Sequence, residues 1–112
     1  MAQNFQRTLK QNISNSSGSA TELRAAADTN DAIIGVRCTN TSGASVDITV
    51  YVRSSSTNYH IIKSAPIPTG GSLELIDGGS KIVLQSGDSV EAYASAASSV
   101  DIILSVVDAI ST

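Results

Sequence analysis

Apolar and polar residues alternate along most of the chain beyond residue 20, in short segments separated by small and polar residues. The clearest segment is 46–53, in which four β-branched residues occupy one parity and Asp47, Thr49, Tyr51 and Arg53 occupy the other. A period of two places alternate side chains on opposite faces of a strand. β-Branched residues fit a half-buried pleated surface, so 46–53 is predicted to be a β-strand.

Further short segments carry the same strand pattern, and turn residues separate them. The segments are 34–38, 59–63, 73–76, 81–85, 90–96 and 100–107, and the turns are 39–43, 54–58, 77–79 and 86–88. About seven or eight strands at this spacing, with no convincing helix between them, are typical of an all-β domain. We predict an antiparallel β-sandwich, jelly-roll-like in its connections, with a fully closed barrel as the lesser alternative.

Two segments restrict where their strands can lie. Pro66 and Pro68 cannot both donate to a central ladder, so 65–71 is predicted to be a connection or an edge. The segment 100–107 has apolar residues on both parities. It is therefore predicted to be central in its sheet or to have its second face covered by something else.

The pattern changes near residue 20, and we divide the chain into an N-terminal arm of residues 1–19 and a β-sandwich domain of residues 20–112. The arm is polar and ends in the Ser- and Gly-rich segment 14–19. Phe5, Leu9 and Ile13 fall at i, i+4 and i+8, which is one stripe of a short helix. Because such a short helix is marginal alone, we expect an extended or short-helical arm that uses these three residues to contact a partner, with a frayed tail as the alternative.

Composition and charge exclude several classes of function. The 112 residues have a net charge of -3, with two basic residues in the arm and five bases against ten acids beyond it. A nucleic-acid partner is not expected, because its binding proteins normally carry a basic surplus. Aromatic residues make up 4%, without tryptophan, which weakens proposals that need stacking platforms. No apolar run reaches membrane-spanning length and no signal-peptide core is present, so neither a membrane nor secretion is expected.

The chain offers little chemistry for catalysis. His60 is the one potential general base, and it lies in a strand pattern without a nucleophile-elbow motif elsewhere. Cys38 is alone, which excludes an intramolecular disulfide, and it shares a predicted strand face with Ile34 and Val36, so a buried hydrophobic role is expected. The carboxylates are dispersed along the sequence, without the spacing of a calcium-binding loop, and no phosphate-loop motif is present. We therefore expect no enzyme, no cofactor and no metal.

Several strand-and-turn sequences together resemble a known class of proteins. They are Ile33-Ile34-Gly35-Val36-Arg37-Cys38-Thr39-Asn40-Thr41, Val46-Asp47-Ile48-Thr49-Val50-Tyr51-Val52, Tyr59-His60-Ile61-Ile62-Lys63, Pro66-Ile67-Pro68, Ser72-Leu73-Glu74-Leu75, Lys81-Ile82-Val83-Leu84 and Gly87-Asp88-Ser89-Val90, with the opening Met1-Ala2-Gln3-Asn4-Phe5 and the closing Ala96-Ala97-Ser98-Ser99-Val100-Asp101. The chain resembles small virion structural proteins of tailed bacteriophages, in particular those of marine cyanobacterial phages. The resemblance covers nearly the whole chain, and its motifs are strand and turn patterns rather than catalytic signatures.

The resemblance implies a non-enzymatic β-sandwich that is present in many copies on the virion, after synthesis in the host cytoplasm. We expect it to form a homo-oligomer and to dock through its arm and one sheet edge onto capsid or tail proteins, as a head decoration or as a neck, tail or baseplate component. The alternative is a host-attachment or carbohydrate-binding module that uses Tyr51, Tyr59 and Tyr93, the three tyrosines of the chain.

Overall fold

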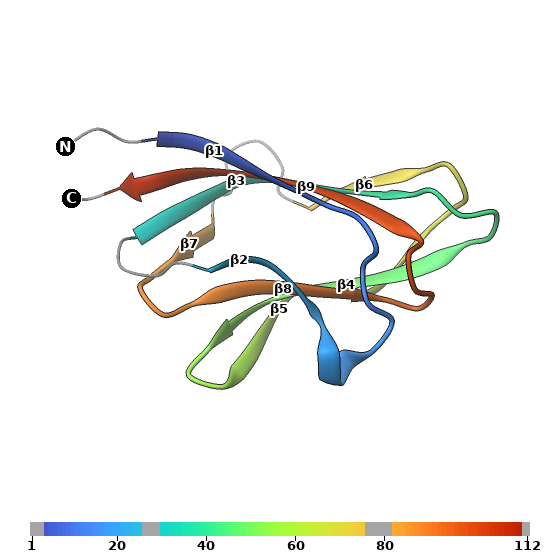
Figure 1. The fold of residues 1–112 in the computed structure, drawn as a ribbon, viewed down its shortest axis with the longest axis horizontal. Coiled ribbons are helices and arrows are strands. Elements are labelled where there is room, and N and C mark those ends of the chain that lie inside the picture. The colour runs from blue at the N-terminus through green and yellow to red at the C-terminus, as the bar shows by residue number, and fades with distance from the viewer. Residues whose placement is uncertain (1–3, 26–29, 76–81, 111–112) are drawn as a thin grey trace.

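The computed structural model describes residues 4–25, 30–75 and 82–110, which form an antiparallel β-sandwich (Figure 1). The five-stranded sheet contains β1 (Asn4–Lys10), β9 (Val100–Ile110), β3 (Asn30–Asn40), β6 (Ser72–Glu74) and β7 (Ile82–Leu84). The four-stranded sheet contains β2 (Thr21–Ala25), β8 (Ser89–Ala94), β4 (Val46–Ser54) and β5 (Thr57–Ile67). A short 3-10 helix, η1 (Ser17–Ser19), lies between β1 and β2. The predicted fold class is confirmed, with nine strands in the described residues.

β6 and β7 occupy one strand position at the edge of the five-stranded sheet. β6 pairs with residues 37–39 of β3 and β7 pairs with residues 31–33, both antiparallel. Counted as one, they give the layer orders β1-β9-β3-β6/β7 and β2-β8-β4-β5, and the chain changes layers after most strands. Two such layers with these crossovers are a jelly roll. The turn predicted at 77–79 lies outside the described residues.

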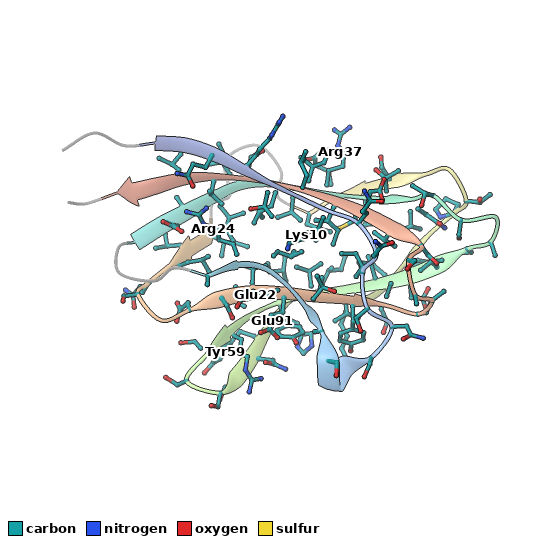
Figure 2. All side chains as sticks on the ribbon, viewed as in Figure 1. Lys10, Glu22, Arg24, Arg37, Tyr59 and Glu91 are labelled. Carbon is teal, nitrogen blue, oxygen red and sulfur yellow. The ribbon has the colours of Figure 1, made fainter. Side chains whose placement is uncertain are left out.

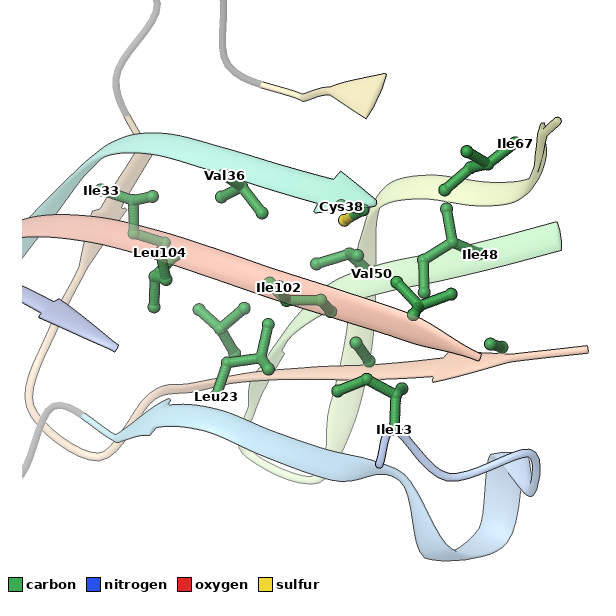
Figure 3. Packing of buried hydrophobic residues seen from close by; sticks show 14 of the residues in the cluster. Ile13, Leu23, Ile33, Val36, Cys38, Ile48, Val50, Ile67, Ile102 and Leu104 are labelled. Atoms are coloured by element: carbon green, nitrogen blue, oxygen red, sulfur yellow. The ribbon is translucent and has the colours of Figure 1, made fainter. Parts of the chain in front are cut away.

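The core between the sheets is almost wholly aliphatic (Figure 3). Its fully buried side chains come from both layers and include Ile33, Val36, Ile48, Val50, Leu84, Val90, Ile102 and Leu104. Full burial of each such side chain stabilises the fold by about 1.5–3 kcal/mol. Cys38 is 0% exposed within this cluster, which confirms its predicted role as a small buried hydrophobe.

The predicted face of Ile34, Val36 and Cys38 needs a correction. The pairing of β3 with β9 shifts between Ile33 and Gly35, which marks a β-bulge. The bulge turns Ile34 outward, where it is 36% exposed, and brings Ile33 to the core in its place. Strict alternation cannot anticipate a bulge, because one extra residue reverses the parity of the strand.

The two restricted segments lie where their composition predicts. β9 is central, between β1 and β3, as the apolar residues on both parities indicated. Pro66 lies in β5, which is the edge strand of the four-stranded sheet, and 68–71 is a turn in which Gly70 has a φ of 74°. An edge position leaves one side of the strand without a ladder, so a proline is tolerated there.

The hairpin between β4 and β5 closes with the two-residue turn Ser55-Ser56. Ser54 pairs with Thr57, and the φ angles of Ser55 and Ser56 are 51° and 63°. Two consecutive positive φ values define a type I′ turn, for which Asn-Gly is the favoured sequence. Two serines are therefore sterically strained at these positions.

A chain carrying Ser55→Asn and Ser56→Gly should be more stable than the wild type. Relief of the strain should raise the free energy of unfolding by about 1 kcal/mol and the midpoint temperature by roughly 4 °C in scanning calorimetry. Ser72→Gly, in β6 and outside the positive-φ region, is the control and should lower stability by about 0.5–1 kcal/mol. A double variant no more stable than the wild type would contradict the strained turn.

Candidate assembly surface

The predicted arm is largely built into the sandwich. β1 pairs with β9 along its whole length, from Asn4 opposite Asp108 to Lys10 opposite Ile102. The boundary at residue 20 therefore does not separate an arm from a domain, and the segment is extended rather than helical. Pairing with a central strand satisfies the backbone hydrogen bonds of β1 on one side. A short isolated helix would be less stable than this paired strand.

The structure does not bring Phe5, Leu9 and Ile13 together on one stripe. Phe5 lies in β1, and its side chain is outside the described residues. Leu9 is 56% exposed in β1, whereas Ile13, beyond the strand, is 0% exposed in the core. The helical spacing was thus misleading, because a strand and the loop after it direct these residues to different surroundings.

Ile13 fixes the crossing from the first sheet to the second (Figure 3). The N–H of Ser98 donates to the carbonyl of Ile13 at 3.1 Å, and the N–H of Ala94 donates to the carbonyl of Ser14 at 2.9 Å. The N–H of Ser14 in turn donates to Oγ1 of Thr21 at 3.0 Å. The polar segment after β1 is therefore anchored by one apolar side chain and three hydrogen bonds.

The outer face of the five-stranded sheet exposes a group of aliphatic side chains. Of the five large hydrophobic residues exposed in the described part of the chain, four lie on this sheet, namely Leu9 at 56%, Ile34 at 36%, Val83 at 53% and Ile103 at 45%. They come from β1, β3, β7 and β9, and we call this surface the apolar face. Leu9 and Ile103 are directly paired across β1 and β9, and neighbouring exposed apolar side chains are typical of an interaction site.

Cross-strand register organises the apolar face into rows. Leu9 lies opposite Ile103, which lies opposite Arg37, which lies opposite Glu74. In the next row Arg7 lies opposite Ser105, which lies opposite Gly35. Because Ser105 and Gly35 are small, this second row is a shallow trough made of two hollows that share Ser105. Ile34 lines one hollow beside Arg7, and Ile103 lines the other beside Arg37.

Gly35 is in the trough without a backbone reason to be glycine. Its φ is not in the left-handed region, and an added Cβ would lie 3.9 Å from Cβ of Ser105, which is ordinary van der Waals contact. A side chain at residue 35 is therefore compatible with the fold and would fill the trough.

An ion pair borders the apolar face at the β6 side. Nε and Nη2 of Arg37 donate to Oε1 of Glu74 at 3.1 and 2.6 Å, and both side chains are about half exposed (Figure 2). Exposed pairs of this kind contribute little to stability. Because the two charges neutralise each other, the ion pair does not prevent an apolar partner from packing on the neighbouring apolar face.

The outer face of the four-stranded sheet is different and holds a ring cluster around Tyr51. The ring of Tyr51 lies 5.4 Å from that of His60 and 6.5 Å from that of Tyr93, and its hydroxyl donates to Oε1 of Glu91 at 2.7 Å. Tyr51 is only 2% exposed, whereas Tyr59 is 61% exposed (Figure 2). The three tyrosines therefore do not form an open stacking platform, and His60 is an exposed cross-strand neighbour of Tyr51.

Burial, followed by the hydrogen bond and the charge of Glu91, raises the pKa of Tyr51 from 10.0 to about 12. In the unfolded chain the phenol ionises near its ordinary value, so above pH 10.0 the unfolded state loses a proton that the folded state keeps. Stability should therefore fall as the pH rises from 10.0 to about 12. In Tyr51→Phe, urea titrations across this range should show a weaker pH dependence; an unchanged dependence would contradict the buried phenol.

The remaining chemistry-bearing residues include the buried carboxylate of Asp31, which accepts from Nε of Arg24 at 2.9 Å, and the lone buried thiol of Cys38. Burial, with a smaller effect from the charge of Glu74, raises the pKa of the Cys38 thiol to about 12, so Cys38 is a poor nucleophile. Within 4–25, 30–75 and 82–110, no group of three or more His, Cys, Asp or Glu side chains is placed to hold a metal ion. Among the same residues no helix is long and apolar enough to cross a membrane.

Comparison with known proteins bears on the fold alone. No family model and no curated protein matches the chain. One solved structure that it resembles is a protein of Bacillus endospore appendages, described as a novel family of disulfide-linked pili. The two share 13% sequence identity and superpose with a TM-score of 0.54, over 98% of this chain and 88% of the other. The likeness thus extends over the whole β-sandwich.

Proposed function

We propose that this chain is a non-enzymatic structural component of a tailed-phage virion, where many copies dock on capsid or tail proteins through the apolar face. The observation that carries the proposal is the exposure of Leu9, Ile34, Val83 and Ile103 on one sheet, with Leu9 and Ile103 paired across strands. Their exposure is unfavourable in water, and an adjoining subunit in a symmetric particle would remove it.

Two further observations support a structural role. Cys38 is a poor nucleophile because its thiol is buried. His60 is exposed, and none of the hydrogen bonds described above joins it to a carboxylate. A β-sandwich of the same fold occurs in Bacillus endospore appendages, which are pili. A pilus is a filament, and a filament is built from repeated subunits. The same fold is therefore compatible with repeated packing in a large assembly.

The proposal is tested by counting copies in purified particles. Quantitative mass spectrometry of virions should find the wild-type chain in hundreds of copies if it covers the head, or in small multiples of the tail symmetry if it lies on the tail axis. Absence of the chain from purified particles would refute the virion role.

A matched pair of variants tests the docking surface. Gly35→Gln fills the trough of the apolar face, whereas Gly43→Gln adds the same side chain on a loop where nothing lies within 4 Å. Both variants should fold with near wild-type stability. When particles assemble in the presence of each variant, Gly43→Gln should be incorporated and Gly35→Gln should not. Equal incorporation of the two would show that the apolar face is not the docking surface.

A further inference from the structure

The four edges of the two sheets differ in how well they can accept another strand. β2 has five residues and a register shift between Glu22 and Arg24. β5 contains Pro66, a positive φ at Ser64 and two register shifts. The third edge is divided between β6 and β7, with three residues each. Short, bulged or proline-containing edges resist strand addition.

β1 lacks these features. It has seven residues, contains no proline and pairs with β9 without a register shift. In the described part of the chain β9 is its one strand partner (Figure 1). Apart from Gln6, whose Oε1 accepts from Nη1 of Arg24 in β2 at 2.8 Å, no hydrogen bond described for β1 comes from outside β9. Alternate residues of an antiparallel strand direct their N–H and C=O groups away from the partner, and seven residues span about 23 Å. The β1 edge is thus a regular template for one more strand.

The charge of β1 bears on which strand can be added. Arg7 and Lys10 are exposed, and the strand contains no acidic residue. Antiparallel pairing of two β1 strands along their whole length would place Arg7 directly opposite Arg7 of the second copy, which is unfavourable. The other three edges of a second copy are irregular, as described above. A second copy is therefore a poor occupant, and a segment with carboxylates is a complementary one.

We propose that the free edge of β1 binds an extended acidic segment of a different protein by strand addition, which lengthens the five-stranded sheet. The inference rests on the proposed function and gives the docking partner its chemistry. Main-chain hydrogen bonds to β1 would supply affinity. A carboxylate beside Lys10, which is on the opposite parity of β1 from Arg7 and Leu9, would select the strand. Apolar side chains of the added strand would continue the apolar face next to Leu9.

The test uses the isolated chain and a synthetic probe. The probe is a capped peptide of about nine residues in which valine and glutamate alternate, and its control has lysine in place of glutamate. Amide hydrogen exchange followed by NMR should show new protection of those amides of residues 4–10 that are directed away from β9 with the glutamate peptide, and no new protection with the lysine peptide. Lys10→Glu should weaken binding of the glutamate peptide, whereas Lys63→Glu, an exposed lysine on the β5 edge, should leave it unchanged.

Three results of the peptide experiment would overturn the inference. These are no protection at millimolar peptide, equal protection by the two peptides, or protection that maps to β5 or β6 instead. Protection of the outward-directed amides of residues 4–10 without any peptide, together with a dimer mass, would assign the edge to a second copy and likewise overturn it. Because the peptide experiment needs no particle, its failure is distinguishable from the failure of the virion role.

Discussion

Asn40→Ala should lower the free energy of unfolding by about 3 kcal/mol or more. Asn40 is 0% exposed at the end of β3. Its Nδ2 donates to the carbonyls of Ala44 and Ile67 at 2.8 and 2.9 Å, and its Oδ1 accepts from N and Oγ of Ser42 at 2.9 and 2.8 Å. Alanine would leave buried polar groups without these partners, which costs more than the bonds themselves contribute.

Urea denaturation at neutral pH measures this loss. Asn15→Ala is the control, because Asn15 is exposed and its replacement should change the free energy of unfolding by less than about 0.5 kcal/mol. Similar effects for the two variants would mean that the Asn40 amide does not hold the 41–45 loop to the end of β5.

Ile13→Ala should destabilise the protein by about 2–5 kcal/mol, the range found when a buried isoleucine is truncated and leaves a cavity. Ile13 is fully buried between the sheets although it lies in a polar segment. Leu9→Ala, at 56% exposure four residues earlier, should change stability by less than about 0.5 kcal/mol.

The same denaturation curves decide between the two views of the first nineteen residues. A detachable arm would predict a small loss for both variants, and the built-in strand predicts a large loss for Ile13→Ala alone. Leu9→Ala should instead weaken attachment to particles, because Leu9 belongs to the apolar face.

The central strands of the fold were predictable from the sequence because they are buried on one face and paired on both sides. The alternation over 46–53 marks β4, and apolar residues on both parities mark β9 as central. Two of the edge strands, β1 and β2, were missed. β2 buries only Leu23, and β1 has a polar sequence, so neither segment shows a clear alternation of apolar and polar residues.

The apolar face could not be read from the sequence as a surface, because it joins residues that are far apart in the chain. Leu9 meets Ile103 only through the β1–β9 register, and Ile34 reaches the face only through a bulge. Ile103 was the one residue whose sequence position pointed to this surface. It lies on the second parity of 100–107, and apolar residues on both parities indicated either a central strand or a covered outer face. β9 is central, and the exposure of Ile103 leaves its outer face free for a neighbour.

Hydroxyl-radical footprinting of the chain in isolation and in purified particles tests the apolar face most directly. We predict that oxidation of Leu9, Val83 and Ile103 falls in the particle, while Tyr59, which is somewhat more exposed and lies on the other sheet, keeps the rate that it has in isolation. Protection of Tyr59 with continued oxidation of the three aliphatic residues would contradict the account.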